Sequence, residues 1–155
     1  MGYKKIKSYI MPEKDLRMIW ETEYCVQPIV TFDNVVVRCY PDQFDHIFYE
    51  SSSRSVKDKA ILSYNRLEKI YWIREALLDP TAILKMGWDA KNKRYFDDRR
   101  VAVIKDNFVV VIRFTGKLKA KIVTAYQKED IQNVLACPDF DKNSNWVKTN
   151  DQDCA

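Results

Sequence analysis

Residues 100–127, RVAVIKDNFVVVIRFTGKLKAKIVTAYQ, decide the fold class of this chain. They hold three runs of β-branched and apolar residues, at 100–105, 107–114 and 119–127. The two junctions carry Asp106-Asn107 and Thr115-Gly116-Lys117, residue types that favour tight reversals of the chain. The stretch therefore predicts an antiparallel meander of three strands.

Further strands are expected before the meander. Two β-branched runs, at 29–32 and 35–40, flank Asp33-Asn34 and predict a hairpin. Weaker strand candidates lie at 81–86 and 94–96. Together these segments predict a sheet of four to six strands.

One long helix is expected over residues 56–78, between the helix-start signal at Ser55 and the stop before Pro80. Its buried stripe has helical spacing and consists of Val56, Ala60, Leu67, Ile70, Ile73 and Leu77. Arg66 and Lys69 are expected to face away from that stripe. With a short N-terminal helix over residues 12–20, the order predicts an α+β domain with the long helix packed on one face of an antiparallel sheet.

The composition fits a single domain over residues 1–155, with a core at about 27–137 and a polar, poorly ordered tail at 138–155. No apolar run is long enough to cross a membrane, and no secretory signal is recognisable, so we expect a cytoplasmic protein. The four cysteines form no CxxC pair and are expected to be reduced. The net charge of +4 leans toward anionic partners.

Several kinds of site are excluded by scarce residue types. The three glycines are far apart, whereas a phosphate-binding loop needs clustered glycines. The serines lack the flanking glycines of a nucleophile elbow. His46 is the single histidine, so neither a two-histidine acid/base pair nor a His-rich metal site can form. No metal and no cofactor are expected.

His46 is nevertheless the side chain best suited to proton transfer at neutral pH. On the last strand, strict alternation places Ala120, Ile122, Thr124 and Tyr126 on one face. The Thr124 and Tyr126 hydroxyls would then lie roughly 7 Å apart, where they could hydrogen-bond a phosphate. A packed histidine, and a strand that simply favours Thr and Tyr, are the alternatives.

Cations are plentiful near these residues. Phosphoryl transfer needs positive charge where the transition state gathers negative charge. Candidates on the strands and their turns are Arg113, Lys117, Lys119 and Lys121, on the helix Arg66 and Lys69, and in the middle segment Arg94, Arg99 and Arg100. A solvated surface accounts for most of them.

Several phrases in this order resemble the phage-associated nucleases of the barnase–EndoU–colicin–RelE group, over residues 29–127. They are DHIFYES (45–51) with His46, Arg66 on the expected helix, LLDP (77–80), VVVIRF (109–114) and KIVTAY (121–126). The resemblance implies a small, metal-independent endoribonuclease, often a toxin, whose site is carried by a curved antiparallel sheet. EndoU-like members use two histidines, whereas this chain has one.

By this resemblance, His46 is the acid/base histidine, Arg66 the helix cation, and Thr124 with Tyr126 the hydroxyl pair. The RNA 2′-hydroxyl would attack the adjacent phosphate and leave a 2′,3′-cyclic phosphate. Further residues expected to contact the substrate are Arg113, Lys69, Lys121 and Glu50. The acid/base partner of His46 could be Glu50, Tyr126 or a lysine. Implied partners are RNA, with tRNA as one candidate, and an immunity or antitoxin protein, but no membrane.

Three other interpretations stay open at this point. The chain could be a catalytically silent module of the same fold that binds RNA or protein. It could be a phage accessory protein whose tryptophans, Trp20, Trp72, Trp88 and Trp146, meet a partner. A metal-dependent nuclease using Asp97-Asp98 or Asp42 and Asp45 is the least favoured, because these carboxylates form no convincing ligand set.

Overall fold

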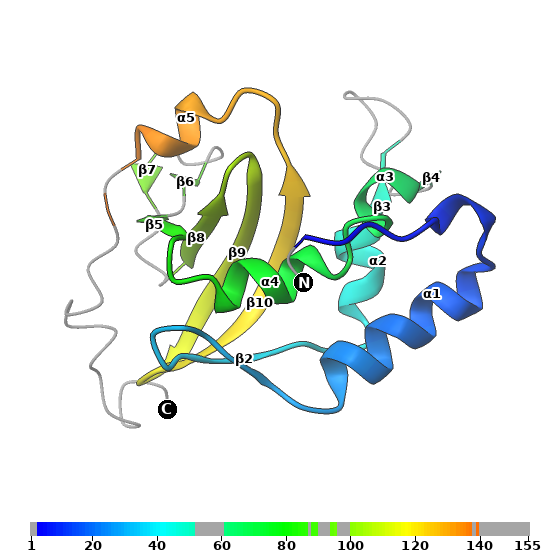
Figure 1. Cartoon of the computed structure of the whole chain (residues 1–155). Coiled ribbons are helices and arrows are strands. Elements are labelled where there is room, and N and C mark those ends of the chain that lie inside the picture. The colour runs from blue at the N-terminus through cyan, green and yellow to red at the C-terminus, as the bar shows by residue number, and fades with distance from the viewer. Residues whose placement is uncertain are drawn as a thin grey trace.

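The computed structural model describes residues 3–51, 61–86, 88–89, 94–95, 100–137 and 139. Within them, the chain is a mixed α+β structure built on a six-stranded sheet (Figure 1). The strand order is β1 (Ile29–Val30), β2 (Val36–Arg38), β10 (Lys119–Gln127), β9 (Phe108–Gly116), β8 (Arg100–Lys105) and β5 (Ile83–Met86). Neighbouring strands are antiparallel except β2 and β10, which are parallel. Two small ladders pair β3 (Tyr49–Glu50) with β4 (Ile61–Leu62), and β6 (Trp88–Asp89) with β7 (Arg94–Tyr95).

The predicted meander is confirmed by β8, β9 and β10. Asp106, with φ of 54°, makes the first turn in the left-handed region that Asp tolerates. The second turn lies one or two residues later than predicted, at Lys117-Leu118, because Gly116 still belongs to β9. Leu118 also has φ of 54°.

The predicted hairpin is confirmed by β1 and β2, which reverse at Asp33-Asn34. Asn34 has φ of 68°, a conformation that Asn adopts more readily than most residues. The Thr31 hydroxyl accepts a hydrogen bond of 3.0 Å from the Val35 N–H and donates one to Asp33. Side-chain bonds within the turn therefore fix the pairing of the two short strands.

The predicted N-terminal helix is confirmed by α1 (Glu13–Trp20). It follows a 3₁₀ turn, η1 (Ser8–Ile10), and continues as a π-helical turn, η2 (Glu21–Cys25). The inner faces of α1 and η2 bury Leu16, Trp20 and Tyr24 completely. The hydrophobic core thus also takes in a segment that precedes the predicted core at 27–137.

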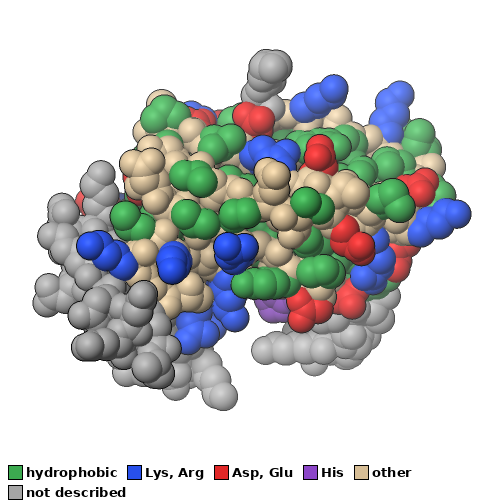
Figure 2. All heavy atoms as spheres, turned by 90° about the horizontal axis from the view of Figure 1, so that it is seen from below, with side chains coloured by type: hydrophobic (Ala, Val, Ile, Leu, Met, Phe, Trp, Pro, Cys, Tyr) green, Lys and Arg blue, Asp and Glu red, His purple; other side chains and the backbone are tan. Residues whose placement is uncertain are grey.

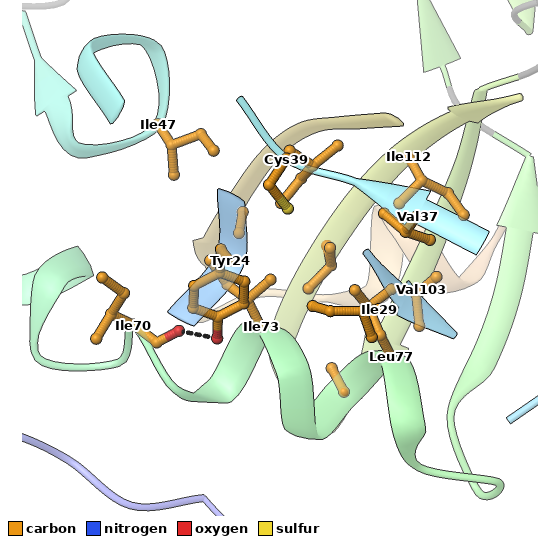
Figure 3. Close-up of a cluster of buried hydrophobic side chains, with 14 of the residues drawn as sticks. Tyr24, Ile29, Val37, Cys39, Ile47, Ile70, Ile73, Leu77, Val103 and Ile112 are labelled. Atoms are coloured by element: carbon orange, nitrogen blue, oxygen red, sulfur yellow. Dashed lines mark hydrogen bonds between the residues drawn. The ribbon is translucent and has the colours of Figure 1, made fainter. Parts of the chain in front are cut away.

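The single long helix predicted over residues 56–78 is wrong. Residues 56–60 lie outside the described residues, and residues 61–78 form β4, α3 (Tyr64–Leu67) and α4 (Trp72–Leu78). A tertiary contact lies at the break between α3 and α4. The Tyr24 hydroxyl donates to the Ile70 carbonyl at 2.6 Å (Figure 3). It also accepts a hydrogen bond of 3.1 Å from the Arg74 N–H. These two backbone groups would bond each other in a continuous helix, so the inserted hydroxyl interrupts the helical ladder.

The buried stripe of the predicted helix is confirmed where it can be seen. Leu67, Ile70, Ile73 and Leu77 are fully buried, and Figure 3 shows Ile73 and Leu77 of α4 among side chains of the sheet. The prediction for Lys69 is wrong, because its side chain is 2% exposed. Val56 and Ala60 lie outside the described residues.

The opposite face of the sheet carries a smaller apolar cluster. Ala102, Ile104 and Val109 are buried there beneath α5 (Gln132–Leu135), together with the partly buried Tyr126. The remaining helix, α2 (Gln43–Phe48), lies beside the sheet near α1 (Figure 1). None of the described helices has the length and apolar character to cross a membrane. Apart from residue 139, the predicted polar tail at 138–155 lies outside the described residues.

Candidate functional site

The short helix α2 carries His46 and is held against the last strand. It follows Pro41, and three of its side chains, Phe44, Ile47 and Phe48, are buried in the core, whereas His46 is exposed. Gln43 ties the start of this helix to the sheet. Its amide N–H donates to the Ile122 carbonyl of β10, and its amide oxygen accepts from the Tyr40 N–H at 2.8 Å.

A polar network holds α2 from the side of α1. Arg17 donates to Glu13 at 2.9 Å and to Asp45 at 2.5 Å, and its guanidinium lies 4.4 Å from the centre of the Phe44 ring. The Tyr49 hydroxyl also donates to Glu13. Hydrogen bonds from Tyr49 and from Arg17 lower the pKa of the Glu13 carboxyl. Asp45, beside His46, is thus engaged by α1.

Arg66 holds the other end of α2. Its guanidinium donates to the Ile47 carbonyl at 3.0 Å, one of the carbonyls in the last turn that lack a helical partner. Arg66 itself is placed by α3, whose start is capped by the Ser63 hydroxyl. In the structure, this predicted catalytic cation positions the helix that carries His46.

A hollow of about 260 Å³ lies between α2 and the sheet. Asp42, Gln43 and His46 line it from the helix side. From the sheet, the lining residues are Arg100, Arg113, Lys121, Ile122 and Val123. Figure 2 shows Lys and Arg side chains gathered on this side of the molecule, next to the histidine. The lining of the hollow thus contains three cations and His46 but one carboxylate, that of Asp42.

The cations of the hollow lie in register across the sheet. Arg113 of β9 pairs with Arg100 of β8 on one side and with Lys121 of β10 on the other. Lys121 pairs in turn with Arg38 of β2. We call these four residues the cationic row. Because residues directly paired across strands point to the same face, the row lies on the face opposite α4.

Like charges directly opposite each other on neighbouring strands repel. A bound anion would offset that repulsion. Concave surfaces lined by one sign of charge also concentrate oppositely charged ligands. In chemical terms, the hollow suits a phosphate group, with an imidazole at its edge.

A β-bulge in β10 changes the face on which the predicted hydroxyls lie. The register shifts between Ile122 and Thr124. Ala120, Ile122 and Ala125 are consequently buried in the main core, and Thr124 pairs with Val111 on the opposite face. The predicted alternation, with Thr124 and Tyr126 on the face of Ala120 and Ile122, is therefore wrong. The two hydroxyl residues share the face of Lys121 instead.

The hydroxyl pair does not line the hollow. Thr124 lies on the sheet face that carries the cationic row, next to that row. Tyr126 packs into the cluster beneath α5. Burial and the nearby Cys137 raise the pKa of the Tyr126 hydroxyl, and the positive charge of Arg66 partly opposes that rise. Of the predicted site residues, His46, Arg113 and Lys121 thus line the hollow, whereas Arg66 and Tyr126 do not.

Two other predicted contact residues also lie outside the hollow lining. The Lys69 ammonium donates to the Asn65 carbonyl and side chain and to Glu68, and it lies 5.8 Å from the centre of the Trp72 ring. Glu50 is exposed on β3, opposite Ile61. Lys69 thus has a complete set of partners inside the fold.

Three residues in the hollow or in the cationic row were not predicted as site residues. Arg100 was noted only as one cation among many, and Gln43 carried no signal in the sequence. Arg38 of the cationic row was also missed, because only the parallel pairing of β2 with β10 brings it beside Lys121. No pattern within a single strand predicts that β2 pairs with β10.

Other reactive side chains give no second site in the described part of the chain. No group of three or more His, Cys, Asp or Glu residues there could hold a metal ion. Cys25, Cys39 and Cys137 are free thiols, and burial raises the pKa of Cys39 to about 12, which leaves it unreactive. Of the tryptophans in the accessory-protein interpretation, Trp20 is buried in the core and Trp72 is partly buried against it, whereas the side chains of Trp88 and Trp146 lie outside the described part of the structure.

Comparison of the chain with protein-family models, curated proteins and solved structures found no match. The resemblance to nucleases therefore stays a prediction that depends on the sequence phrases alone. The hollow and the residues that line it are the structural basis of the proposed function.

Proposed function

We propose that this chain binds RNA through its phosphates in the hollow and cleaves it as a metal-independent endoribonuclease. The observation that supports the proposal is the shared lining of His46 with Arg100, Arg113 and Lys121. A phosphodiester needs positive charge around its non-bridging oxygens and a proton-transfer group at one side. The hollow offers both.

In the proposed reaction, the 2′-hydroxyl attacks its own adjacent phosphate. A 2′,3′-cyclic phosphate forms, and the bond to the 5′-oxygen of the next nucleotide breaks. His46 transfers the proton as base or acid, a role worth about 10²–10⁴-fold in rate. Arg113, Arg100 and Lys121 stabilise the additional negative charge of the transition state. Of the partners considered for His46, a lysine is favoured, because Lys121 lines the same hollow.

The remaining predicted residues take lesser roles in this proposal. Thr124 lies on the same face as the cationic row and would contact a neighbouring part of the substrate. Arg66 acts through α2, whose last turn it holds, and is a positioning residue. The same proposal includes the remaining predictions from the sequence. They are a curved sheet, a toxin role, a tRNA substrate, an immunity or antitoxin protein as partner, and a cytoplasmic location.

The direct test is incubation of the purified protein with total RNA in EDTA, followed by chemical analysis of the new ends. Cyclic-phosphate termini that disappear with His46→Ala would support the proposal. Lys14→Ala, an exposed change on α1, is the control and should cleave normally. RNA that stays intact in the presence of folded protein, over a range of protein concentrations, would rule out cleavage.

A catalytically silent RNA-binding module is the second candidate. It is favoured by the positions of Glu50 and Tyr126, two of the considered acid/base partners, which do not line the hollow. Anion binding needs only the cations that do. Tight, salt-sensitive binding of RNA by a protein that never cleaves it would decide for this candidate.

A further inference from the structure

We propose that phosphate binding extends beyond the hollow along the whole cationic row, so that the ligand is an extended single strand crossing the sheet. The inference rests on the RNA binding in the proposed function and names its substrate class. It assigns a binding role to Arg38, which does not line the hollow. Arg38 would hold a phosphate next to the one bound by Lys121 and Arg113.

The position of Arg38 supports this subsite. Val37 is completely buried in the core, so Arg38, the next residue of β2, points to the outer face. It is directly paired with Lys121 in the parallel ladder, and its side chain is exposed. The β2–β10 pairing therefore lengthens the cationic surface by one strand past the hollow.

The length of the row argues for several phosphates. Neighbouring strands lie about 4.8 Å apart, so four strands place the row over about 14 Å. Side chains on a strand stand roughly perpendicular to the sheet, and a charge-assisted hydrogen bond is only about 2.8 Å long, so one phosphate is best contacted by neighbouring members of the row and leaves the outermost cation for another phosphate. A chain of phosphates running perpendicular to the strands can contact all four side chains.

The shape of the hollow argues for a single strand. With about 260 Å³ between α2 and the sheet, it admits a group of nucleotide size. His46 and Gln43 line its helix side, and Asp42 beside them places negative charge there. A double helix holds its phosphates on a stiff, convex surface and would contact only the rim. An unpaired strand can bend a phosphate into the hollow, as in other positively charged grooves for single strands.

The test measures binding by the full-length His46→Ala protein, which keeps the RNA intact. The probe is a labelled RNA of about 12 nucleotides, unpaired or annealed to its complement, titrated over a range of salt concentrations. Arg38→Gln should lower the slope of log affinity against log salt by about 0.7, the value for one contact with a single strand. The duplex should bind at least about tenfold more weakly than the single strand. Lys14→Gln is the matched control for loss of one exposed charge and should leave the slope unchanged.

The outcomes separate this inference from the proposed cleavage. A reduced slope with Arg38→Gln, together with RNA left intact by the natural sequence, supports the row and contradicts the nuclease. Cleavage by the natural sequence, with an unchanged slope or equal duplex affinity, overturns the row and leaves the nuclease standing. Absence of RNA binding at low salt overturns the row outright. Thermal unfolding of Arg38→Gln, expected at or slightly above the melting temperature of the parent because one like-charge pair is removed, shows that the exposed change leaves the fold intact.

Discussion

Lys121 and Arg113 lie directly opposite each other on the antiparallel strands β10 and β9, so two like charges occupy one register position. Each has a further cation beside it, Arg38 next to Lys121 and Arg100 next to Arg113. Opposed like charges on a sheet cost stability, of the order of 0.2–1 kcal/mol per pair. Repulsion of this kind is a stability cost that ligand-binding residues commonly carry.

Replacement of Lys121 by Gln should make the protein more stable and its RNA binding weaker. The change removes repulsion with two neighbours, so the free energy of unfolding should rise by about 0.2–1 kcal/mol at low salt. The gain should shrink as salt screens the charges. Thermal unfolding and RNA titration on the same samples check both effects. A lower melting temperature at low salt would show that the Lys121 stem contributes more by packing than its charge costs.

Tyr24→Phe should destabilise the protein by about 1–3 kcal/mol. Without the hydroxyl, the Ile70 carbonyl and the Arg74 N–H both lose their hydrogen-bond partner inside the core. Denaturant unfolding measures the loss, with the exposed Tyr40→Phe as control. A change of less than about 0.5 kcal/mol would mean that the two backbone groups bond each other directly, which the continuous helical ladder permits.

Asp79 should make stability depend on acidity. The Thr81 hydroxyl and N–H donate to this carboxylate at 2.6 and 2.9 Å, the Tyr3 hydroxyl donates at 2.9 Å, and Lys105 lies 3.6 Å away. Mainly through Thr81, these contacts lower the pKa of Asp79 from 3.8 to about 2. Since the folded pKa is the lower one, the stabilisation is complete above pH 3.8 and is lost as the pH falls through about 2.

Asp79→Asn therefore should cost about 1–2 kcal/mol at neutral pH and progressively less below pH 3.8. Urea midpoints of both proteins between neutral pH and the acid limit measure the difference. Asp33→Asn, which lies in the hairpin turn, serves as a comparison carboxylate. If the difference in unfolding free energy between the parent and Asp79→Asn stays constant down to about pH 2, the assigned titration of Asp79 is contradicted.

Gln43 should affect cleavage more than binding. Its amide holds α2, and with it His46, against the Ile122 carbonyl, whereas the cations of the row are fixed by the sheet. Gln43→Ala should lower kcat/KM by about tenfold or more, because small displacements of a reacting group are costly. The affinity for RNA should change only a few-fold. Gln43→Glu keeps the acceptor for the Tyr40 N–H and loses the donor, so it should be as slow as Gln43→Ala if the bond to Ile122 is what matters.

The elements that sequence patterns predicted well are those stabilised locally. The β-branched runs of β8, β9 and β10, the Asp33-Asn34 turn and the apolar stripe at Leu67, Ile70, Ile73 and Leu77 all have the expected form. Between α3 and α4 of the predicted long helix, the hydroxyl of Tyr24, from a distant segment, takes the place of one bond of the helical ladder. The bulge after Ile122 was equally invisible, since a single extra residue reverses the faces without altering the composition.

The candidate site could be predicted only in part for a related reason. His46, Arg113 and Lys121 were recognised by residue type, and the fold does bring them to one hollow. Arg38 and Arg100 join them through strand register, and Gln43 through a helix of only six residues that has too few turns for a periodic signal. The side chains that carry charge were visible in the sequence, but their neighbours were not.

The central place of β10 sets an order of events during synthesis. This strand is the last of the six to leave the ribosome, yet it joins β2 on one side to β9 on the other. Until it is in place, the N-terminal hairpin has no neighbour in the sheet, and Lys121 cannot complete the row. Distant pairings of this kind slow folding. A nascent chain halted before residue 119 would thus lack the hollow, so the proposed ligand could be bound only after β10 has been synthesised.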